Sequence, residues 1–91
     1  MNYAIIWLDA ALEQVARHYI PLWGTPAAAA VTAAMARIDR ELEQNPMTAG
    51  ESRLGNVRIL FDFPISINFE VHTDQQTVIV TGVRYHPPKT E

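Results

Sequence analysis

From Val57 onward, hydrophobic and polar residues alternate along the chain, a pattern typical of β-strands with one covered face. The apolar positions of one parity are expected to face the helices: Val57, Ile59, Phe61, Phe63, Ile65, Ile67, Phe69 and Val71. The intervening positions are expected to form a polar face, with Arg58, Leu60, Asp62, Ser66, Asn68 and Glu70. We therefore predict an antiparallel three-strand meander over residues 53–58, 64–71 and 77–85, with a turn at residues 73–76.

The N-terminal part of the chain predicts a strand followed by a helix. Residues 3–8 form a short apolar run, which we expect to be a strand buried on both faces. Asp9 is expected to cap a helix that Pro21 ends near Tyr19, because proline lacks the N–H that the helix interior needs. The residues at helical spacing predict one buried stripe: Leu12, Val15, Ala16, Tyr19, Ile20 and Trp23.

A second helix is predicted directly after the first. Gly24, Thr25 and Pro26 suit a helix end, an N-cap and a first helical turn in that order. The new helix runs to about Gln44, where the following Asn45-Pro46 pair stops it. Its predicted buried stripe is Val31, Ala34, Met35, Ile38 and Leu42. Residues 47–55 then form a loop that is longer than most connections, and long loops often carry function.

Composition limits the classes of protein to which this chain can belong. The 91 residues suit a single domain, 1–91, and 48% hydrophobic residues suit a folded protein. There is no cysteine, and the three histidines are not spaced as zinc ligands, so we expect no metal and no cofactor. The first residues read neither as a signal peptide nor as a membrane span, so we expect a cytoplasmic protein. The net charge of −3 offers no overall attraction for a phosphate backbone, so any nucleic-acid contact must be local.

The order strand, helix, helix, strand, strand, strand resembles the RelE/ParE superfamily of bacterial toxin–antitoxin toxins, which includes plasmid stabilisation proteins. The segments that carry the resemblance are RELEQNPMTAGESR and NVRILFDFPISINFEVHTDQQTVIVTGVR. The resemblance covers nearly the whole chain and implies an α+β fold. In that fold a β-α-α-β-β-β chain packs a helical hairpin on a mainly antiparallel sheet.

The resemblance also implies two activities within one fold. RelE-like members cut messenger RNA on the ribosome without a metal, ParE-like members inhibit DNA gyrase, and a cognate antitoxin neutralises both. Arg84 matches the arginine that often ends the last strand in nuclease members, and Tyr85 and His86 stand near the position of a C-terminal acid or base. Arg58 and Arg53 are candidates for additional phosphate contacts.

Two departures from the nuclease pattern keep other functions open. Ser66 stands where nuclease members commonly carry an arginine, and Lys89 is the only lysine. The first hypothesis is a type II toxin that acts as a metal-independent mRNA endoribonuclease. The alternatives are a ParE-like toxin that inhibits gyrase without nuclease activity, or a degenerate member that only binds an antitoxin.

Each candidate residue also has a structural interpretation. Arg84 could be a solvated arginine paired with Glu70 or Asp62, and strand parity could turn Tyr85 toward the core. A lone histidine in a proline-rich tail, such as His86, is commonly exposed. The aromatic residues of the N-terminal part are expected to fill the core rather than to line a pocket: Trp7, Tyr19 and Trp23.

Overall fold

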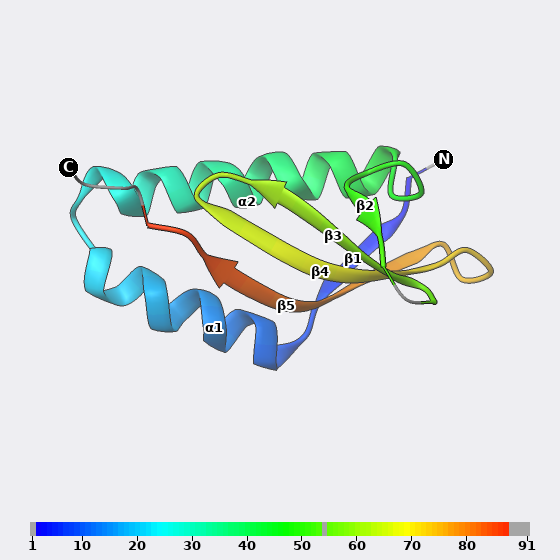
Figure 1. The fold of residues 1–91 in the computed structure, drawn as a ribbon, viewed down its shortest axis with the longest axis horizontal. Coiled ribbons are helices and arrows are strands. Elements are labelled where there is room, and N and C mark those ends of the chain that lie inside the picture. Colours follow the sequence, from blue (N-terminus) through cyan, green and yellow to red (C-terminus); the bar gives the residue numbers. More distant parts are fainter. Residues whose placement is uncertain (1, 54, 88–91) are drawn as a thin grey trace.

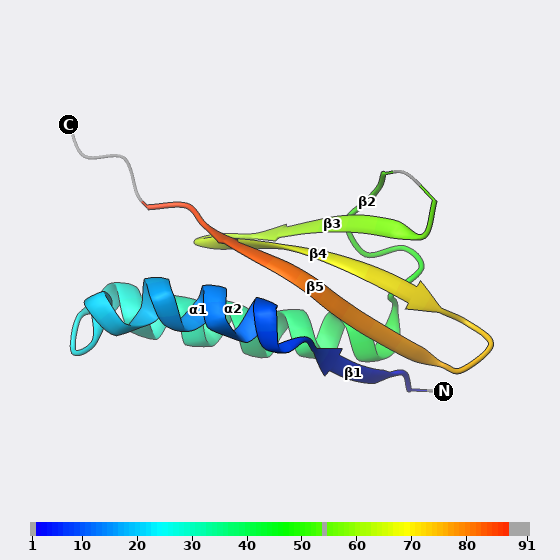
Figure 2. The same cartoon turned by 90° about the horizontal axis from the view of Figure 1, so that it is seen from below.

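Two helices pack on one face of a five-stranded sheet in the computed structural model, which describes residues 2–53 and 55–87 (Figures 1 and 2). The elements in chain order are β1 (Ala4–Trp7), α1 (Asp9–Tyr19), the 3-10 turn η1 (Ile20–Leu22), α2 (Pro26–Gln44), β2 (Glu51–Ser52), β3 (Val57–Asp62), β4 (Ile65–His72) and β5 (Thr77–Tyr85). This arrangement confirms the predicted α+β class and the helical hairpin. The short β2 was not predicted and lies within the expected loop.

The sheet has the strand order β1-β5-β4-β3-β2. Strands β2 to β5 are antiparallel to their neighbours, and β1 pairs in parallel with the first half of β5. An extra residue on β5 shifts the register, because Asn68 pairs with Gly82 whereas Phe69 pairs with Val80. The sheet is therefore mainly antiparallel, as predicted, and its N-terminal and C-terminal strands are neighbours.

The core lies between α2 and the helix-covered face of the sheet. The predicted stripe of α2 is confirmed, since Val31, Ala34, Ile38 and Leu42 are buried and Met35 packs against them. On β4 every second residue is buried, as the alternation predicted: Ile65, Ile67, Phe69 and Val71. Together, these side chains form one continuous apolar cluster between the two layers.

The predicted orientation of β3 is wrong. Asp62 pairs with Ile65 across the turn at Phe63 and Pro64, and Leu60 pairs with Ile67. Directly paired residues share a face, so the even-numbered positions of β3 face the helices and the odd-numbered positions face away. The prediction was wrong because it continued the alternation of apolar and polar residues through Pro64, as if the chain did not turn there. A two-residue turn reverses the parity between its strands.

Helix α1 also differs from its predicted form. Its N-cap is Leu8, and Asp9 is the first helical residue rather than the cap. Ala11 is buried and Val15 and Tyr19 are partly buried, whereas Trp23, expected in the core, is 75% exposed. The helix touches the sheet along the end of β5, so only a narrow stripe of α1 is covered. No helix among the described residues is long and apolar enough to cross a membrane.

The edge strand β1 is covered on one face only, against the prediction of two covered faces. Trp7 faces α2, and its indole N–H donates a hydrogen bond of 2.9 Å to a carboxylate oxygen of Asp39. Ile6, which points to the other side, is exposed. Only one helical layer is present, so alternate residues of this strand remain accessible.

Candidate functional site on the open face of the sheet

The face of the sheet opposite the helices carries the candidate site. We call it the open face, and the register assigns to its centre Val57, Ile59, Phe61, Ser66, Asn68, Gly82 and Arg84. Figure 2 shows that both helices lie on the other side of the strands. Phe61, near the end of β3, is 57% exposed, although phenylalanine is among the most often buried residue types. The open face therefore combines exposed apolar side chains with a few polar groups, a composition typical of binding surfaces.

His86 is held over this face by the end of the β3–β4 hairpin. Its backbone N–H donates a hydrogen bond of 2.7 Å to the carbonyl oxygen of Pro64. The imidazole Nε2 lies 2.9 Å from Ser66 Oγ, and the ring centroid lies 4.8 Å from that of Phe61. Three separate contacts thus fix a side chain that the sequence suggested would be loose in the tail.

Arg84 lies beside this histidine and is exposed. It pairs across the strands with Ser66, which puts both side chains on the open face. The two acidic residues considered as its partners are engaged elsewhere: Asp62 with Arg37 at 2.8 Å, and Glu70 with His72 at 3.2 Å. Within residues 2–53 and 55–87, the Arg84 guanidinium makes no ion pair. It is therefore a cation with free donors at the rim of the site.

Tyr85 points to the opposite side of the sheet. It pairs with the buried Ile65, packs against the core and stacks on His18 of α1 with ring centroids 5.6 Å apart. The structural interpretation from strand parity is thus confirmed for its orientation. The three residues at the chain end that we grouped as catalytic candidates are divided by the sheet, with Arg84 and His86 on one face and Tyr85 on the other.

The two arginines considered for phosphate contacts lie in different surroundings. Arg58 lies on the helix-covered side of β3, where Nε donates to the carbonyl oxygen of Ala49 at 3.0 Å and Nη2 to that of Gly50 at 3.2 Å. These bonds tie β3 to the segment between α2 and β2. Arg53 is exposed beyond β2 and makes an ion pair of 3.2 Å with Glu51. Only Arg53 of the two borders the open face, beside Val57.

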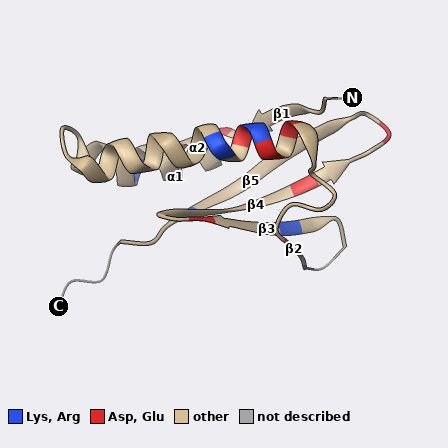
Figure 3. Ribbon diagram, turned by 90° about the horizontal axis from the view of Figure 1, so that it is seen from above, with Lys and Arg blue, Asp and Glu red and all other residues tan. Residues whose placement is uncertain are grey.

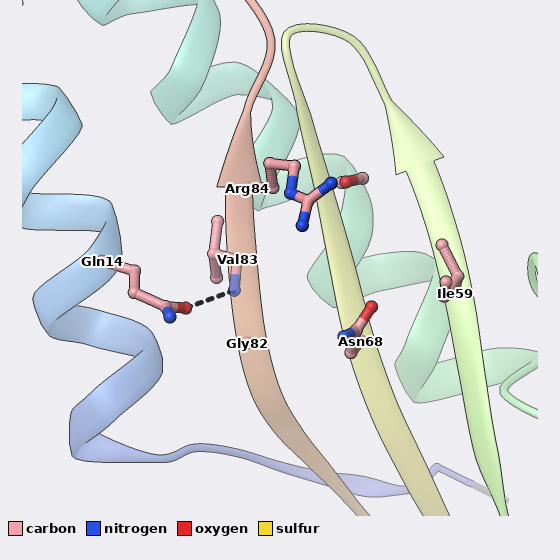
Figure 4. Close-up of a pocket in the computed structure, with 7 residues that line it drawn as sticks. Gln14, Ile59, Asn68, Gly82, Val83 and Arg84 are labelled. Carbon is pink, nitrogen blue, oxygen red and sulfur yellow. Dashed lines mark hydrogen bonds between the residues drawn. The ribbon is translucent and has the colours of Figure 1, made fainter.

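A hollow of about 260 Å³ lies next to Arg84 on the open face (Figure 4). Its floor is Gly82, and the amide side chains of Gln14 and Asn68 stand on either side. Gln14 reaches it from α1 and accepts a hydrogen bond of 2.7 Å from the Val83 N–H. The sequence analysis did not select Gln14, Asn68 or Phe61 as site residues. The available signal was the glycine in the middle of a β-branched strand, which often marks a close approach.

Charge elsewhere is concentrated on α2. Figure 3 shows acidic and basic residues alternating along the C-terminal half of this helix, whereas most of the sheet is uncharged. Arg37 of α2 donates from Nε and Nη2 to the Asp62 carboxylate at 2.8–3.2 Å, and this bonding raises the pKa of Arg37 above its ordinary value despite partial desolvation. The guanidinium therefore stays charged at all physiological pH values and holds α2 to the end of β3.

Several solved structures share this architecture at low sequence identity. The RelBE2 toxin–antitoxin complex from Mycobacterium tuberculosis matches with a TM-score of 0.73 and 12% identity, covering 94% of this chain and 93% of that chain. The chromosomal ParDE system from P. aeruginosa matches with a TM-score of 0.66 and 21% identity, covering 93% and 97%.

The E. coli toxin RelE, in the free state and with two arginines replaced by alanine, matches with a TM-score of 0.65 and 15% identity, covering 93% of this chain and 84% of that chain. No protein-family model and no curated protein matches this chain. The fold of this chain thus recurs, over nearly the whole length, in structures of the RelBE2 complex, the ParDE system and the toxin RelE. The chain has the RelE/ParE fold.

Proposed function

We propose that this protein is the toxin component of a type II toxin–antitoxin pair and that it cleaves RNA on the open face of the sheet without a metal. The observation that carries the nuclease proposal is the grouping of Arg84, Ser66, His86 and Phe61 at one end of that face. The fold supports the toxin assignment, since the similar structures are toxins or toxin–antitoxin complexes.

The four side chains supply the groups that such a cleavage needs. His86 can remove the proton of a ribose 2′-hydroxyl as the bond from this oxygen to phosphorus forms. The resulting imidazolium can return a proton to the 5′ oxygen as the bond from phosphorus to that oxygen breaks, and the contact of Nε2 with the Ser66 hydroxyl orients the ring. Arg84 can hold the phosphate and stabilise the charge that develops on it during in-line attack. The exposed face of Phe61 can stack on a base, as aromatic residues do in many single-stranded RNA sites.

The remaining candidates take supporting roles in this proposal. Arg53, at the far end of the open face, is placed for a second phosphate contact. Arg58 is occupied by backbone carbonyl groups, and its role is to hold the strand that carries Phe61. Tyr85 stands behind the sheet, where its packing against His18 supports the end of β5.

The proposed partner is an antitoxin protein. RelBE2 and ParDE are complexes or systems of a toxin with its antitoxin, and their toxins share this fold. Helix α2 is rich in alanine, and such small side chains allow an amphipathic partner helix to approach closely.

The test compares single substitutions for growth arrest and for RNA cleavage by the purified protein in the presence of EDTA. We expect Arg84→Ala and His86→Ala each to lower the cleavage rate by about 100-fold or more, because each removes a group that acts in the transition state. Arg17→Ala, an exposed arginine on α1, is the matched control and should cleave normally. Full cleavage by Arg84→Ala, with unchanged thermal unfolding, would exclude the proposed site.

A second candidate function is inhibition of DNA gyrase by protein contact. Ser66 favours it, because this residue stands opposite Arg84 where nuclease members commonly carry an arginine. The identity to ParDE, 21%, is also the highest among the three structures compared here. Plasmid supercoiling assays with purified gyrase separate the two functions. Loss of supercoiling together with intact RNA would establish the gyrase inhibitor and refute the nuclease.

A further inference from the structure

Ser66 and His86 bring a hydroxyl group and an imidazole together on the open face. Ser66 Oγ lies 2.9 Å from His86 Nε2, although the two residues are 20 positions apart in the chain. A serine hydroxyl is a weak nucleophile alone, and a base within roughly 2.6–3.2 Å activates it by accepting its proton. The pair therefore has the geometry of a nucleophile with its general base.

The base of such a pair must itself be held in place, and two further contacts hold His86. Its backbone N–H donates a hydrogen bond of 2.7 Å to the carbonyl oxygen of Pro64, which fixes the chain at this residue. Its ring lies against Phe61, with ring centroids 4.8 Å apart, which limits rotation of the imidazole. Nε2 is thus kept facing the Ser66 hydroxyl.

A cation stands next to the hydroxyl. Arg84 pairs directly with Ser66 across the strands, and its side chain extends from β5 over β4, the strand that carries Ser66 (Figure 4). Within the described part of the chain, the guanidinium makes no ion pair. A free guanidinium stabilises negative charge on a nearby oxygen. Arg84 is therefore placed for the oxyanion that forms when a hydroxyl attacks a carbonyl carbon.

The hydroxyl can be reached by a small molecule. Ser66 is only partly buried, and it lines the hollow of about 260 Å³ together with Arg84. Ile59 of β3 gives this hollow an apolar wall, against which a short acyl chain can lie. The volume is below that of pockets for drug-sized ligands, roughly 300–1,000 Å³, so the hollow suits a small ester.

We infer that Ser66 is a nucleophile that accepts acyl groups from carboxylic esters, with His86 as its general base and Arg84 as the oxyanion-stabilising cation. The Ser66 oxygen bonds to the carbonyl carbon while His86 takes the hydroxyl proton. The bond from this carbon to the alcohol oxygen then breaks, and the imidazolium returns the proton to that oxygen. Water, deprotonated by His86, later attacks the acyl group and releases a carboxylic acid as Ser66 regains a proton. This activity is separate from RNA cleavage, in which a ribose hydroxyl is the nucleophile.

The first experiment measures acetylation of the purified protein by p-nitrophenyl acetate, with the modified residue identified by peptide mass spectrometry. We expect the acetyl group on Ser66 and none on Ser52, an exposed serine of β2 that serves as the internal control. His86→Ala and Arg84→Ala should each slow this acetylation by about 100-fold or more, because base and cation act in the transition state. Arg17→Ala should react normally.

The second experiment tests whether Ser66 is activated or only orients the histidine. The chain has no cysteine, so Ser66→Cys and Ser52→Cys each introduce a single thiol. We expect iodoacetamide to react at least about tenfold faster with Ser66→Cys, because the neighbouring imidazole and guanidinium favour the thiolate. Access alone predicts the opposite order, since Ser52 is exposed and Ser66 is partly buried. Adding His86→Ala should remove the difference.

The outcomes separate this inference from the proposed nuclease, because neither experiment contains RNA. Acetylation of Ser52 as fast as that of Ser66, or a thiol in Ser66→Cys that reacts no faster than the one in Ser52→Cys, would overturn the inference. RNA cleavage by a protein whose Ser66 is unreactive would overturn it and keep the nuclease. A reactive Ser66 in a protein that does not cleave RNA would support the inference and refute the nuclease.

Discussion

The two faces of the sheet are built from the same kinds of residue but differ in what covers them. On the helix-covered face, Phe69 of β4 is fully buried, whereas Phe61 on the open face is more than half exposed. The charged residues show the reverse arrangement. Arg58 and Asp62 point toward the helix layer, where backbone carbonyls and Arg37 bind them. The comparison teaches that on β3 the apolar Phe61 faces solvent, whereas the charged Arg58 and Asp62 serve the structure.

This placement of an apolar side chain in solvent and charged side chains on the covered side lowers stability. A surface that binds no ligand would not be expected to have it. An exposed apolar side chain gains little from folding, and a polar residue would be tolerated equally well at Phe61. The charged residues on the covered side are only partly buried, and each is bound by hydrogen-bond partners there. The composition of β3 is therefore explained better by binding on the open face than by stability.

The largest effect is expected from Phe69→Ala on the covered face. Removing this buried ring should lower the free energy of unfolding by about 3–5 kcal/mol, because it leaves a cavity in the core. That is a large part of the roughly 5–15 kcal/mol expected of a small domain. Urea unfolding followed by circular dichroism measures it. A loss below about 1 kcal/mol would show that the two faces are not energetically distinct.

The matched change on the open face is Phe61→Ala. Here we expect the free energy of unfolding to fall by no more than about 1 kcal/mol, mainly through the lost contact with His86. RNA cleavage should fall by at least about tenfold, because stacking on an aromatic ring contributes about 1–3 kcal/mol per base. Steady-state cleavage rates at a temperature well below unfolding provide the measurement. Unchanged cleavage would remove Phe61 from the site.

A smaller effect is expected from Arg58→Met, which keeps the aliphatic stem of the side chain and removes its donors. The carbonyls of Ala49 and Gly50 would lose their hydrogen-bond donors. We expect the free energy of unfolding to fall by about 1–2 kcal/mol, because the Arg58 side chain is only partly buried. Urea unfolding checks the magnitude. If cleavage falls while stability is unchanged, Arg58 contacts the substrate instead of the backbone.

The smallest effect is expected from Arg37→Ala. Its pair with Asp62 is exposed and screened by solvent, so we expect only a slight decrease in melting temperature. The decrease should vanish in about 1 M salt, where charges are screened over about 3 Å. Melting curves at low and at high salt measure this decrease in melting temperature. A decrease that persists at high salt would indicate that the pair acts through packing.

Local signals predicted where the two helices end and which side of β4 is buried. Gly24, Thr25 and Pro26 mark the boundary between the helices, Pro46 follows the end of α2, and the alternation of β4 gives its buried side. These signals act over a few residues, where sequence and structure are directly linked. The exposure of Trp23 could not be predicted in this way, because Trp23 lies beyond α1 and the 3-10 turn η1, where the α-helical spacing no longer applies.

The site was predicted only in part for a related reason. Arg84 and His86 lie together, as their two-residue spacing in the chain suggested. Tyr85, which stands between them in the chain, lies on the other face of the sheet. Phe61 was assigned to the wrong face because the turn at Phe63 and Pro64 was not counted. Asn68 and Gln14 come together only through the register of β4 and the placement of α1. Such long-range contacts have no local signature.

The hydrogen bond from Val83 to Gln14 has a consequence for how this protein behaves in concentrated solution. Strand β1 pairs only with the first half of β5, so the second half has an unpaired edge beside α1. Unpaired edges invite pairing with strands of other molecules, which leads to aggregation. Gln14 occupies the Val83 N–H with a side chain from the same molecule. A single glutamine thus occupies one of the N–H groups through which this edge could pair with another molecule.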